Sequence, residues 1–399
     1  MLSSQRANVL LLALCQALMV TGMSVIAIAS ALVGQALAAD KSLATLPLAL
    51  QQLAVMMTAL PASLLMKRIG RRAGFSIGAV LGLLGGLLQS EAVYRPDFGL
   101  FCLGNVLFGI AAGFALFYRF AATDTADAAF RSKAISLVMA GGVIASVAGP
   151  ALARWSNGWL APVGFAGCFL AIAVLQGLAG LLIQFVRIPR PNEDERRRAG
   201  RPLSTIMRQP IFLVSVLGGT IGYGVMSLVM TATPLAMIDC SYSFPDTAFV
   251  IQWHMLGMFV PSFFTGHLIA RFGVLRVMLA GAGLLAGCVL VNLSGTAIWQ
   301  FWAGLVLLGT GWNFLYIGAS SLLTESYRPE ERAKTQGAND FLVFGVVTVA
   351  CLASGVLHNL YGWQALNAAV LLPIGLAAAA ILWLSRRRGT FAERKVESA

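Results

Sequence analysis

The sequence predicts an all-α protein that crosses a lipid bilayer twelve times, and three observations lead to this fold class. Of its 399 residues, 58% are hydrophobic and only 11% are charged, whereas soluble proteins carry about 25% charged residues. Uncharged apolar runs of about 20 residues, each long enough to cross a bilayer as a helix, recur along the chain. Markers in the first half also return in the second half in the same order. We therefore expect two six-helix bundles related by pseudo-symmetry.

The apolar runs define the twelve expected spans. They cover residues 7–33, 44–66, 73–93, 98–121, 132–153, 161–186, 210–236, 247–270, 275–294, 298–323, 335–357 and 362–384. The first run is too long for the core of a signal peptide, and more than ten further runs follow it. We therefore expect it to be a membrane span that is not cleaved.

The net charge of +12 follows the expected topology. With the amino terminus in the cytoplasm, only Lys41, Arg95 and Arg154 of the 28 basic residues fall on the outer side. This positive-inside pattern predicts that both termini are cytoplasmic. The basic run at residues 196–201 could also touch anionic lipid headgroups. Charge therefore favours a bilayer over nucleic acid as the partner.

The longest polar interruption, RIPRPNEDERRRAGRPLSTIMRQP, begins at residue 187 and contains prolines, mixed charges and no apolar periodicity. It divides the chain into a first bundle (1–186), a cytoplasmic linker (187–209), a second bundle (210–385) and a cytoplasmic tail (386–399). We expect a monomer.

The two halves repeat at a nearly constant offset, which indicates a duplicated six-helix unit. LFG at 107–109 returns as LLG at 307–309, after 200 residues. Three polar markers do the same: Arg68 with Gly70 matches Arg271 with Gly273, Asp124 matches Glu325, and Arg131 with Lys133 matches Arg332 with Lys334.

With these motifs the chain resembles the major facilitator superfamily of secondary transporters over essentially its whole length. The family signature G-x3-D-R-x-G-R-R stands here as SLLMKRIGRR, and GHLIARFG is its weaker repeat in the second half. The glycine-rich fifth-helix motif appears as GGVIASVAGP, ending at Gly149 and Pro150. The chain departs from the family pattern at Ser63 (usually glycine), at Lys67 and Ala270 (usually aspartate) and at Asn105 (usually arginine a turn before the glycine of helix 4).

The basic turn MKRIGRR can reverse the chain because glycine at position 70 tolerates positive φ. Its arginines can bond carboxylates at neighbouring helix ends, with Asp124 and Asp127 the nearest candidates. The resemblance implies that such pairs hold one conformer and release it in another; the alternative is that the charges only set topology. The expected gating residues are Arg68, Gly70, Arg71, Asp124, Arg131, Gly149, Pro150, Arg271, Gly273, Glu325 and Arg332.

Polar groups in a membrane span normally face a cavity. Of the 16 acidic residues, only Asp340 falls plausibly inside a span, about two turns into helix 11. This scarcity suits neutral or anionic cargo better than cationic drugs. His254 could carry a coupling proton or act only as a buried hydrogen-bonding group. Arg119 could face the cavity or extend to the inner interface.

Aromatic side chains at similar depths favour stacking on a planar ring. The expected substrate-binding residues are Gln16, Asn105, Arg119, Tyr223, Gln252, His254, Trp312, Asn313, Asn339 and Asp340, of which about half should serve packing.

The sequence therefore predicts a secondary transporter of a small organic solute, working by alternating access. No GxxxxGK[ST] or HExxH occurs, which argues against an ATP-driven pump and a membrane enzyme. The six cysteines show no CxxC spacing, so we expect no disulfide, metal or cofactor. A non-transporting receptor stays open as a third class. The missing carboxylates and the altered signature favour uptake of a neutral or anionic nutrient, and the aromatic residues favour a flat heterocycle. Some bacterial members of the family import vitamins such as riboflavin, which the resemblance makes the best candidate. The alternative is proton-coupled efflux, which the Gly-Pro motif supports.

Overall fold

The computed structural model describes residues 2–40, 43, 46–124, 126, 127, 130–160, 163–188 and 200–397. These residues form helices joined by short turns, and no strand occurs among them. The long helices are α1 (Leu2–Leu37), α2 (Leu46–Ile69), α3 (Arg71–Tyr94), α4 (Phe98–Ala115), α6 (Arg131–Ser156), α7 (Ala166–Ile183), α10 (Pro210–Asp239), α11 (Phe244–Phe259), α12 (Ser262–Phe272), α13 (Val274–Leu293), α14 (Ile298–Leu323), α15 (Arg332–Ala369) and α16 (Leu371–Glu397). The short ones are α5 (Tyr118–Ala121), α9 (Leu203–Met207) and the 3₁₀ turn η2 (Pro329–Glu331).

Ten stretches of the described chain are long and apolar enough to span a membrane. The expected span at 247–270 is divided between α11 and α12, because Pro261 interrupts the helix there. The last two expected spans fall in one stretch, Pro329–Arg388, inside which Gly362 adopts a non-helical φ of 76°. The all-α membrane fold is confirmed, whereas the count of twelve crossings stays a prediction.

Local sequence explains where several helices begin. The Asp97 carboxylate accepts a hydrogen bond from the Leu100 amide at 2.9 Å and so caps α4. Ser243 and Asp246 form a reciprocal capping box at the start of α11. Pro210 occupies the first turn of α10, where a missing backbone donor costs nothing.

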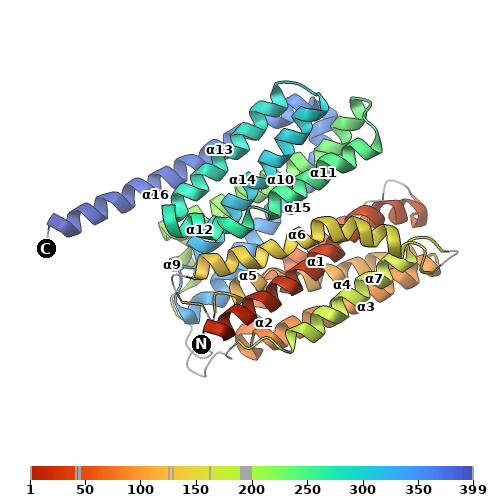
Figure 1. Ribbon diagram of the computed structural model, residues 1–399, viewed down its shortest axis with the longest axis horizontal. Helices are drawn as coiled ribbons and strands as arrows, with labels where there is room; N and C mark the ends of the chain where they lie inside the picture. The colour runs from red at the N-terminus through yellow and green to blue at the C-terminus, as the bar shows by residue number, and fades with distance from the viewer. Residues whose placement is uncertain are drawn as a thin grey trace. The chain divides into compact units, whose positions relative to one another are not determined.

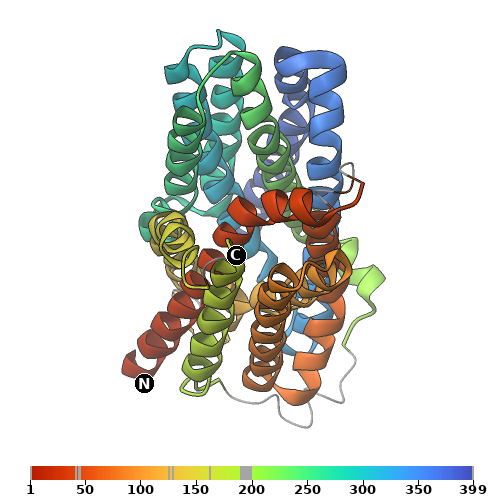
Figure 2. The same cartoon turned by 90° about the vertical axis from the view of Figure 1, so that its right-hand side faces the viewer.

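The chain forms two compact units. Unit 1 comprises Met1–Ala199 together with Pro329–Thr348, and unit 2 comprises Gly200–Arg328 together with Val349–Ala399. The first part of α15 therefore packs with the helices of the first half of the chain. In unit 1, α4 lies against α2 and α3, α3 also contacts α7, and α1 packs on α6 and α7 (Figures 1 and 2).

Unit 2 is built around α14, which contacts α10, α11 and α13. The last helix, α16, packs on α10 and α13. The core of this unit is aromatic and aliphatic, with Trp312 and Phe301 almost fully buried. The helix α14 is therefore the central helix of unit 2.

The duplication seen in the sequence recurs in the geometry of the turns. Gly70 joins α2 to α3 with φ 89° and ψ 159°, and Gly273 joins α12 to α13 with φ 87° and ψ 150°. L-residues with a side chain essentially never adopt this region. A close contact between two helices is also duplicated. A Cβ on Gly109 would overlap the Gln51 carbonyl, and a Cβ on Gly309 would overlap the His254 carbonyl. Each half therefore keeps its glycines where the backbone needs them.

Candidate functional site

The basic turn at residues 67–72 sends its arginines in different directions. Arg71 is buried, with 8% of its side chain exposed, whereas Arg68 is exposed. Arg72 donates from Nε and Nη2 to Gln184 Oε1 at 3.3 and 3.1 Å, and so ties α3 to α7. Of the three arginines, Arg71 is thus the one directed into the protein.

Arg71 leads to a buried cluster around Asp124, whose side chain is 6% exposed. Arg71 Nε lies 3.1 Å from Oδ2 of Asp124, and Arg332 Nη1 lies 2.9 Å from Oδ1. Arg71 Nη2 also donates to Gln336 Oε1 at 2.7 Å. The carboxylate expected to pair with the turn does so, with one arginine on each oxygen. The other candidate, Asp127, accepts from the Phe130 amide at 2.8 Å.

A second buried ion pair lies deeper in unit 1. Arg119 Nη2 lies 2.5 Å from Oδ1 of Asp340, and the two side chains are 4% and 0% exposed. Asn339 Nδ2 donates to the same oxygen at 2.9 Å, and Arg119 Nη1 donates to the Leu116 carbonyl at 2.6 Å. Asp340 Oδ2 has no hydrogen-bond partner among the described residues. Arg119 therefore does not extend to the interface; it neutralises the carboxylate that the sequence places inside a span.

The other expected residues of unit 1 differ in their burial and contacts. Asn105 is fully buried and donates to the Phe101 carbonyl at 2.9 Å. Gln16 is half-buried on α1. Gly149, next to Pro150 in α6, lies against Ser24 of α1 with no room for a side chain. Arg131 is exposed and has no ion-pair partner among the described residues.

In unit 2, an aromatic cluster surrounds Trp312. Its ring stacks on Tyr316 with centroids 5.2 Å apart and an interplanar angle of 18°. Tyr223 and Phe259 meet it edge-on, at 5.3 and 5.9 Å. Trp312 is 1% exposed, whereas Tyr223 is half-buried, and the indole Nε1 has no hydrogen-bond partner among the described residues. The cluster thus combines a buried flat face, one more accessible tyrosine and one unused donor.

The remaining polar residues of unit 2 hold helices together. His254 is fully buried, with Nδ1 2.9 Å from the Leu305 carbonyl of α14. Asn313 donates to the Met258 carbonyl and to Ser262 Oγ, both at 2.6 Å. It bridges the break in the helix at Pro261. Gln252 is exposed and does not join the aromatic cluster.

The expected gating residues of unit 2 lie at its surface. Arg271 is exposed and lies over the ring of Phe272 at 5.3 Å. Glu325 pairs with Arg388 at 2.7 Å, with side-chain exposures of 45% and 37%. The acid at this position therefore has a partner from α16 in place of an arginine from the turn.

Three residues that sequence reasoning missed are part of these clusters. Tyr316 follows Trp312 by four residues, and that spacing puts both rings on one helix face, so the pattern could have indicated it. Phe259 and Gln336 had no comparable signal, because their neighbours come from distant helices. No group of three or more His, Cys, Asp or Glu side chains suited to a metal ion occurs in the described part of the chain.

Repeated bundles of membrane-spanning helices are a feature of many secondary transporters. Residues 12–252 and 218–398 match the sequence model of the Major Facilitator Superfamily. The chain belongs to this family of multi-pass membrane proteins, whose members are transporters and not enzymes.

Individual relatives agree with this family. The chain is 38% identical to the riboflavin transporter RfnT of Brucella anthropi, over 98% of this chain and 99% of RfnT. It is 28% identical to YddS, an MFS-type transporter of Bacillus subtilis, over 90% and 86% of the two chains. The fold matches the MFS transporter FucP in its outward conformation, with a TM-score of 0.74, 17% identity and coverage of 96% and 99%. It also matches the human organic anion transporter MFSD10, with a TM-score of 0.76, 15% identity and coverage of 94% and 99%.

Proposed function

We propose that this transporter imports a flat, neutral or anionic heterocyclic nutrient, and that riboflavin is its substrate. The observation that carries the proposal is the 38% identity to a riboflavin transporter along the whole chain. The Trp312 cluster adds a flat aromatic surface suited to an isoalloxazine ring. The ion pair of Asp340 with Arg119 supports a neutral or anionic substrate, because the paired carboxylate is not free to bind a cationic substrate.

Uptake and binding test this proposal together. Cells that require riboflavin and lack their own transporter should accumulate labelled riboflavin when they express the chain. Purified protein should quench flavin fluorescence on titration, because stacking on an indole quenches the excited ring. Trp312→Ala should weaken this binding at least about fivefold, since stacking of a base on an aromatic side chain is worth about 1–3 kcal/mol and about 1.4 kcal/mol corresponds to tenfold. Trp299→Ala, at a tryptophan that is 59% exposed, is the matched control and should bind as wild type.

Proton-coupled efflux is the alternative, and the Gly149–Pro150 motif of α6 favours it. Inverted vesicles distinguish the two directions. Under import, labelled riboflavin leaves preloaded inverted vesicles, whereas efflux predicts its accumulation inside them when a proton gradient is imposed. If a cationic dye accumulates in the vesicles and riboflavin does not inhibit that accumulation, the cargo is a different compound.

We propose protons as the coupling ion, carried by His254 or Asp340. Both side chains are fully buried, and each has one polar atom without a partner among the described residues. His254→Gln keeps a hydrogen bond to Leu305 but cannot titrate, so substrate binding should stay within a few-fold of wild type while pH-driven accumulation is lost. Asp340→Asn is tested in the same way. If pH-driven accumulation persists in both variants, neither residue carries the coupling proton. If the wild-type protein shows no pH-driven accumulation, it is a uniporter.

We infer that the transporter lies in a bacterial inner membrane as a monomer, with both termini in the cytoplasm. The charges of the described helices support this orientation. Arg71 and Arg72 start α3 and Tyr94 ends it, and basic residues start α6 while Trp155 lies at its other end. Basic residues favour the cytoplasmic side and aromatic residues the interface. Cysteine labelling of Ser3→Cys and Glu397→Cys in intact cells should fail with a reagent that does not cross membranes.

The gate we propose is the release of Pro329–Thr348 from unit 1. The side chains of Arg332, Gln336 and Asp340 in this segment bond to the first half of the chain, and the Ala333 carbonyl accepts a hydrogen bond from Ser63 of α2. In alternating access, their partners Asp124, Arg71 and Arg119 hold the segment in one conformer. Breaking these bonds lets α15 move away from α3 and α5 in the other conformer.

A further inference from the structure

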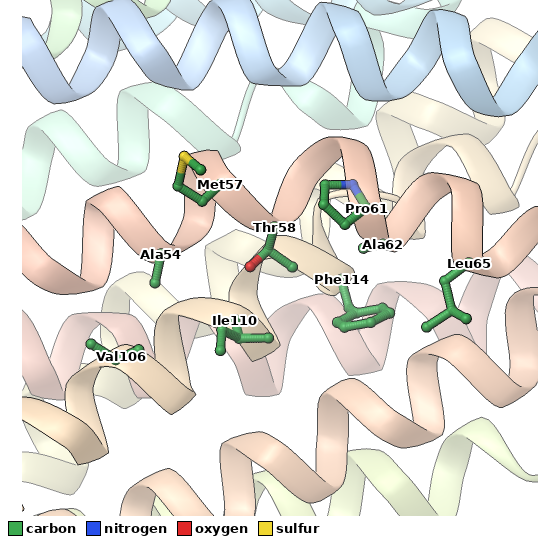
Figure 3. Close-up of a pocket in the computed structure, with 9 residues that line it drawn as sticks. All are labelled: Ala54, Met57, Thr58, Pro61, Ala62, Leu65, Val106, Ile110 and Phe114. Carbon is green, nitrogen blue, oxygen red and sulfur yellow. The ribbon is translucent and has the colours of Figure 1, made fainter.

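A groove of about 390 Å³ runs between α2 and α4 on unit 1 (Figure 3). Its α2 side is lined by Ala54, Met57, Thr58, Pro61, Ala62 and Leu65, and its α4 side by Val106, Ile110 and Phe114. The only polar side-chain group in this lining is the Thr58 hydroxyl. None of its lining residues belongs to the Trp312 cluster or to the ion pairs around Asp124 and Asp340, so transport as proposed above does not use it.

The two helices are close at the floor of the groove because of two glycines on α4. Gly109 lies directly on the backbone of Gln51, and a Cβ on Gly113 would lie 2.7 Å from the Thr58 Cβ. Larger residues of α2 and α4 form the walls of the groove. Met57 is 56% exposed and Leu65 36% exposed. In a helix that spans a membrane, such an open apolar channel faces hydrocarbon.

The length of the groove matches one leaflet. From Ala54 to Leu65 the helix advances eleven residues, about 16 Å at about 1.5 Å per residue. The hydrocarbon core of a bilayer is about 30 Å thick, so one leaflet takes about 15 Å. A single acyl chain therefore fits the groove from end to end.

A cation marks one end of the groove. Arg68 follows Leu65 by one turn, and at 3.6 residues per turn it projects between Met57 and Pro61, on the groove side of α2. Lys67 projects to the opposite side. Arg68 is exposed, and its guanidinium has no hydrogen-bond or ion-pair partner among the described residues. An arginine of this kind binds phosphate through two parallel hydrogen bonds.

We propose that the α2–α4 groove binds an anionic phospholipid, with one acyl chain between Ala54 and Leu65 and the headgroup phosphate on Arg68. The apolar lining selects the chain, and the single arginine selects the charge of the headgroup. The site would place a lipid next to the turn whose other arginine, Arg71, bonds to Asp124.

Native mass spectrometry of the full chain in detergent, titrated with dioleoyl-phosphatidylglycerol or dioleoyl-phosphatidylcholine, tests the headgroup. Wild type should bind the glycerol lipid at least fivefold more tightly. Arg68→Gln should bring the affinities of the two lipids within twofold of each other, because both carry the phosphate and only the net charge of the headgroup distinguishes them. Arg276→Gln removes another exposed arginine, on α13, and should keep the preference. An unchanged preference in Arg68→Gln overturns the headgroup site.

The groove itself is tested with a phosphatidylglycerol that carries a photoreactive diazirine in its acyl chain. Label should concentrate on the peptides that contain residues 54–65 and 106–114 of the wild-type protein. Ile110→Trp fills the groove and should reduce that label at least threefold, whereas Leu181→Trp, at an exposed site on α7, should not. Label spread over all lipid-facing helices in proportion to their exposure overturns the proposal, even if Ile110→Trp fails to fold.

Discussion

The turns at Gly70 and Gly273 have the same backbone conformation, but the charged groups near them are buried in unit 1 and exposed in unit 2. Both glycines adopt φ near 88° with ψ near 155°, and each joins two membrane helices. In unit 1, the residue after the glycine is Arg71, which is buried on Asp124. In unit 2, the residue after the glycine is Val274, and the acid corresponding to Asp124 is Glu325, which pairs at the surface with Arg388.

This difference shows which part of the duplicated motif is required by the backbone and which part differs between the two units. The glycine is needed twice because the chain must reverse twice. The buried charge occurs at one turn, where Asp124 also bonds to Arg332 on α15. Buried pairs are strongly destabilising to break, whereas exposed pairs are worth about 0–1 kcal/mol. We therefore expect the two turns to differ in energy and in their effect on transport.

The largest effect should come from the deepest ion pair in unit 1. Asp340→Asn leaves Arg119 buried without a countercharge, which should cost about 3–5 kcal/mol of unfolding free energy. The matched control is Glu91→Gln, which breaks the exposed Glu91–Arg95 pair in the same unit and should cost under about 1 kcal/mol. Unfolding in mixed micelles measures both. Equal costs would contradict the claim that burial sets the energy.

Next in size is a charge reversal beside Asp124. Arg332→Glu puts a second carboxylate at a site where the wild-type distance is 2.9 Å, so it should slow transport at least tenfold. Arg131→Glu, at the corresponding exposed arginine of the first half, should slow transport less than threefold. Both variants are compared at equal membrane abundance. Equal losses in the two variants would mean that the charges act through topology, and the gating role of Arg332 would be lost.

Substitution of the two turn glycines should have a smaller effect on the unfolding free energy, and the effect should be the same at both turns. Gly70→Ala and Gly273→Ala each force a Cβ into a backbone region that only glycine populates, at a cost of about 1–3 kcal/mol. Since φ and ψ nearly coincide, the two costs should agree within about 1 kcal/mol. A much larger cost at Gly70 would show that the glycine in unit 1 also supports the Asp124 cluster.

The smallest effect should be at the surface pair of unit 2. Glu325→Gln breaks the bond to Arg388 and should change the unfolding free energy by about 0–1 kcal/mol, and less still in high salt. Asp124→Asn is the direct comparison and should cost about 1.5–3 kcal/mol, because charged hydrogen bonds are lost at a buried site. If the two variants behave alike, the difference between the turns has no energetic meaning.

The sequence by itself determined the features that depend on neighbouring residues. Apolar length predicts a membrane-spanning helix, and a glycine between two such runs predicts a sharp reversal, because both are properties of the local chain. The repeat of Arg68 and Gly70 as Arg271 and Gly273 was readable for the same reason. The pairing of Arg71 with Asp124 could be anticipated, since both lie at the ends of neighbouring helices.

Only the tertiary structure decided which distant side chains meet. Arg119 and Asp340 are 221 residues apart, and nothing in either segment indicates that they form an ion pair. The burial of His254 against α14 and the opening of a groove between α2 and α4 likewise depend on how whole helices pack. The physical reason is that local sequence determines whether a segment is helical, whereas the packing of whole helices determines which face of a helix contacts which neighbour.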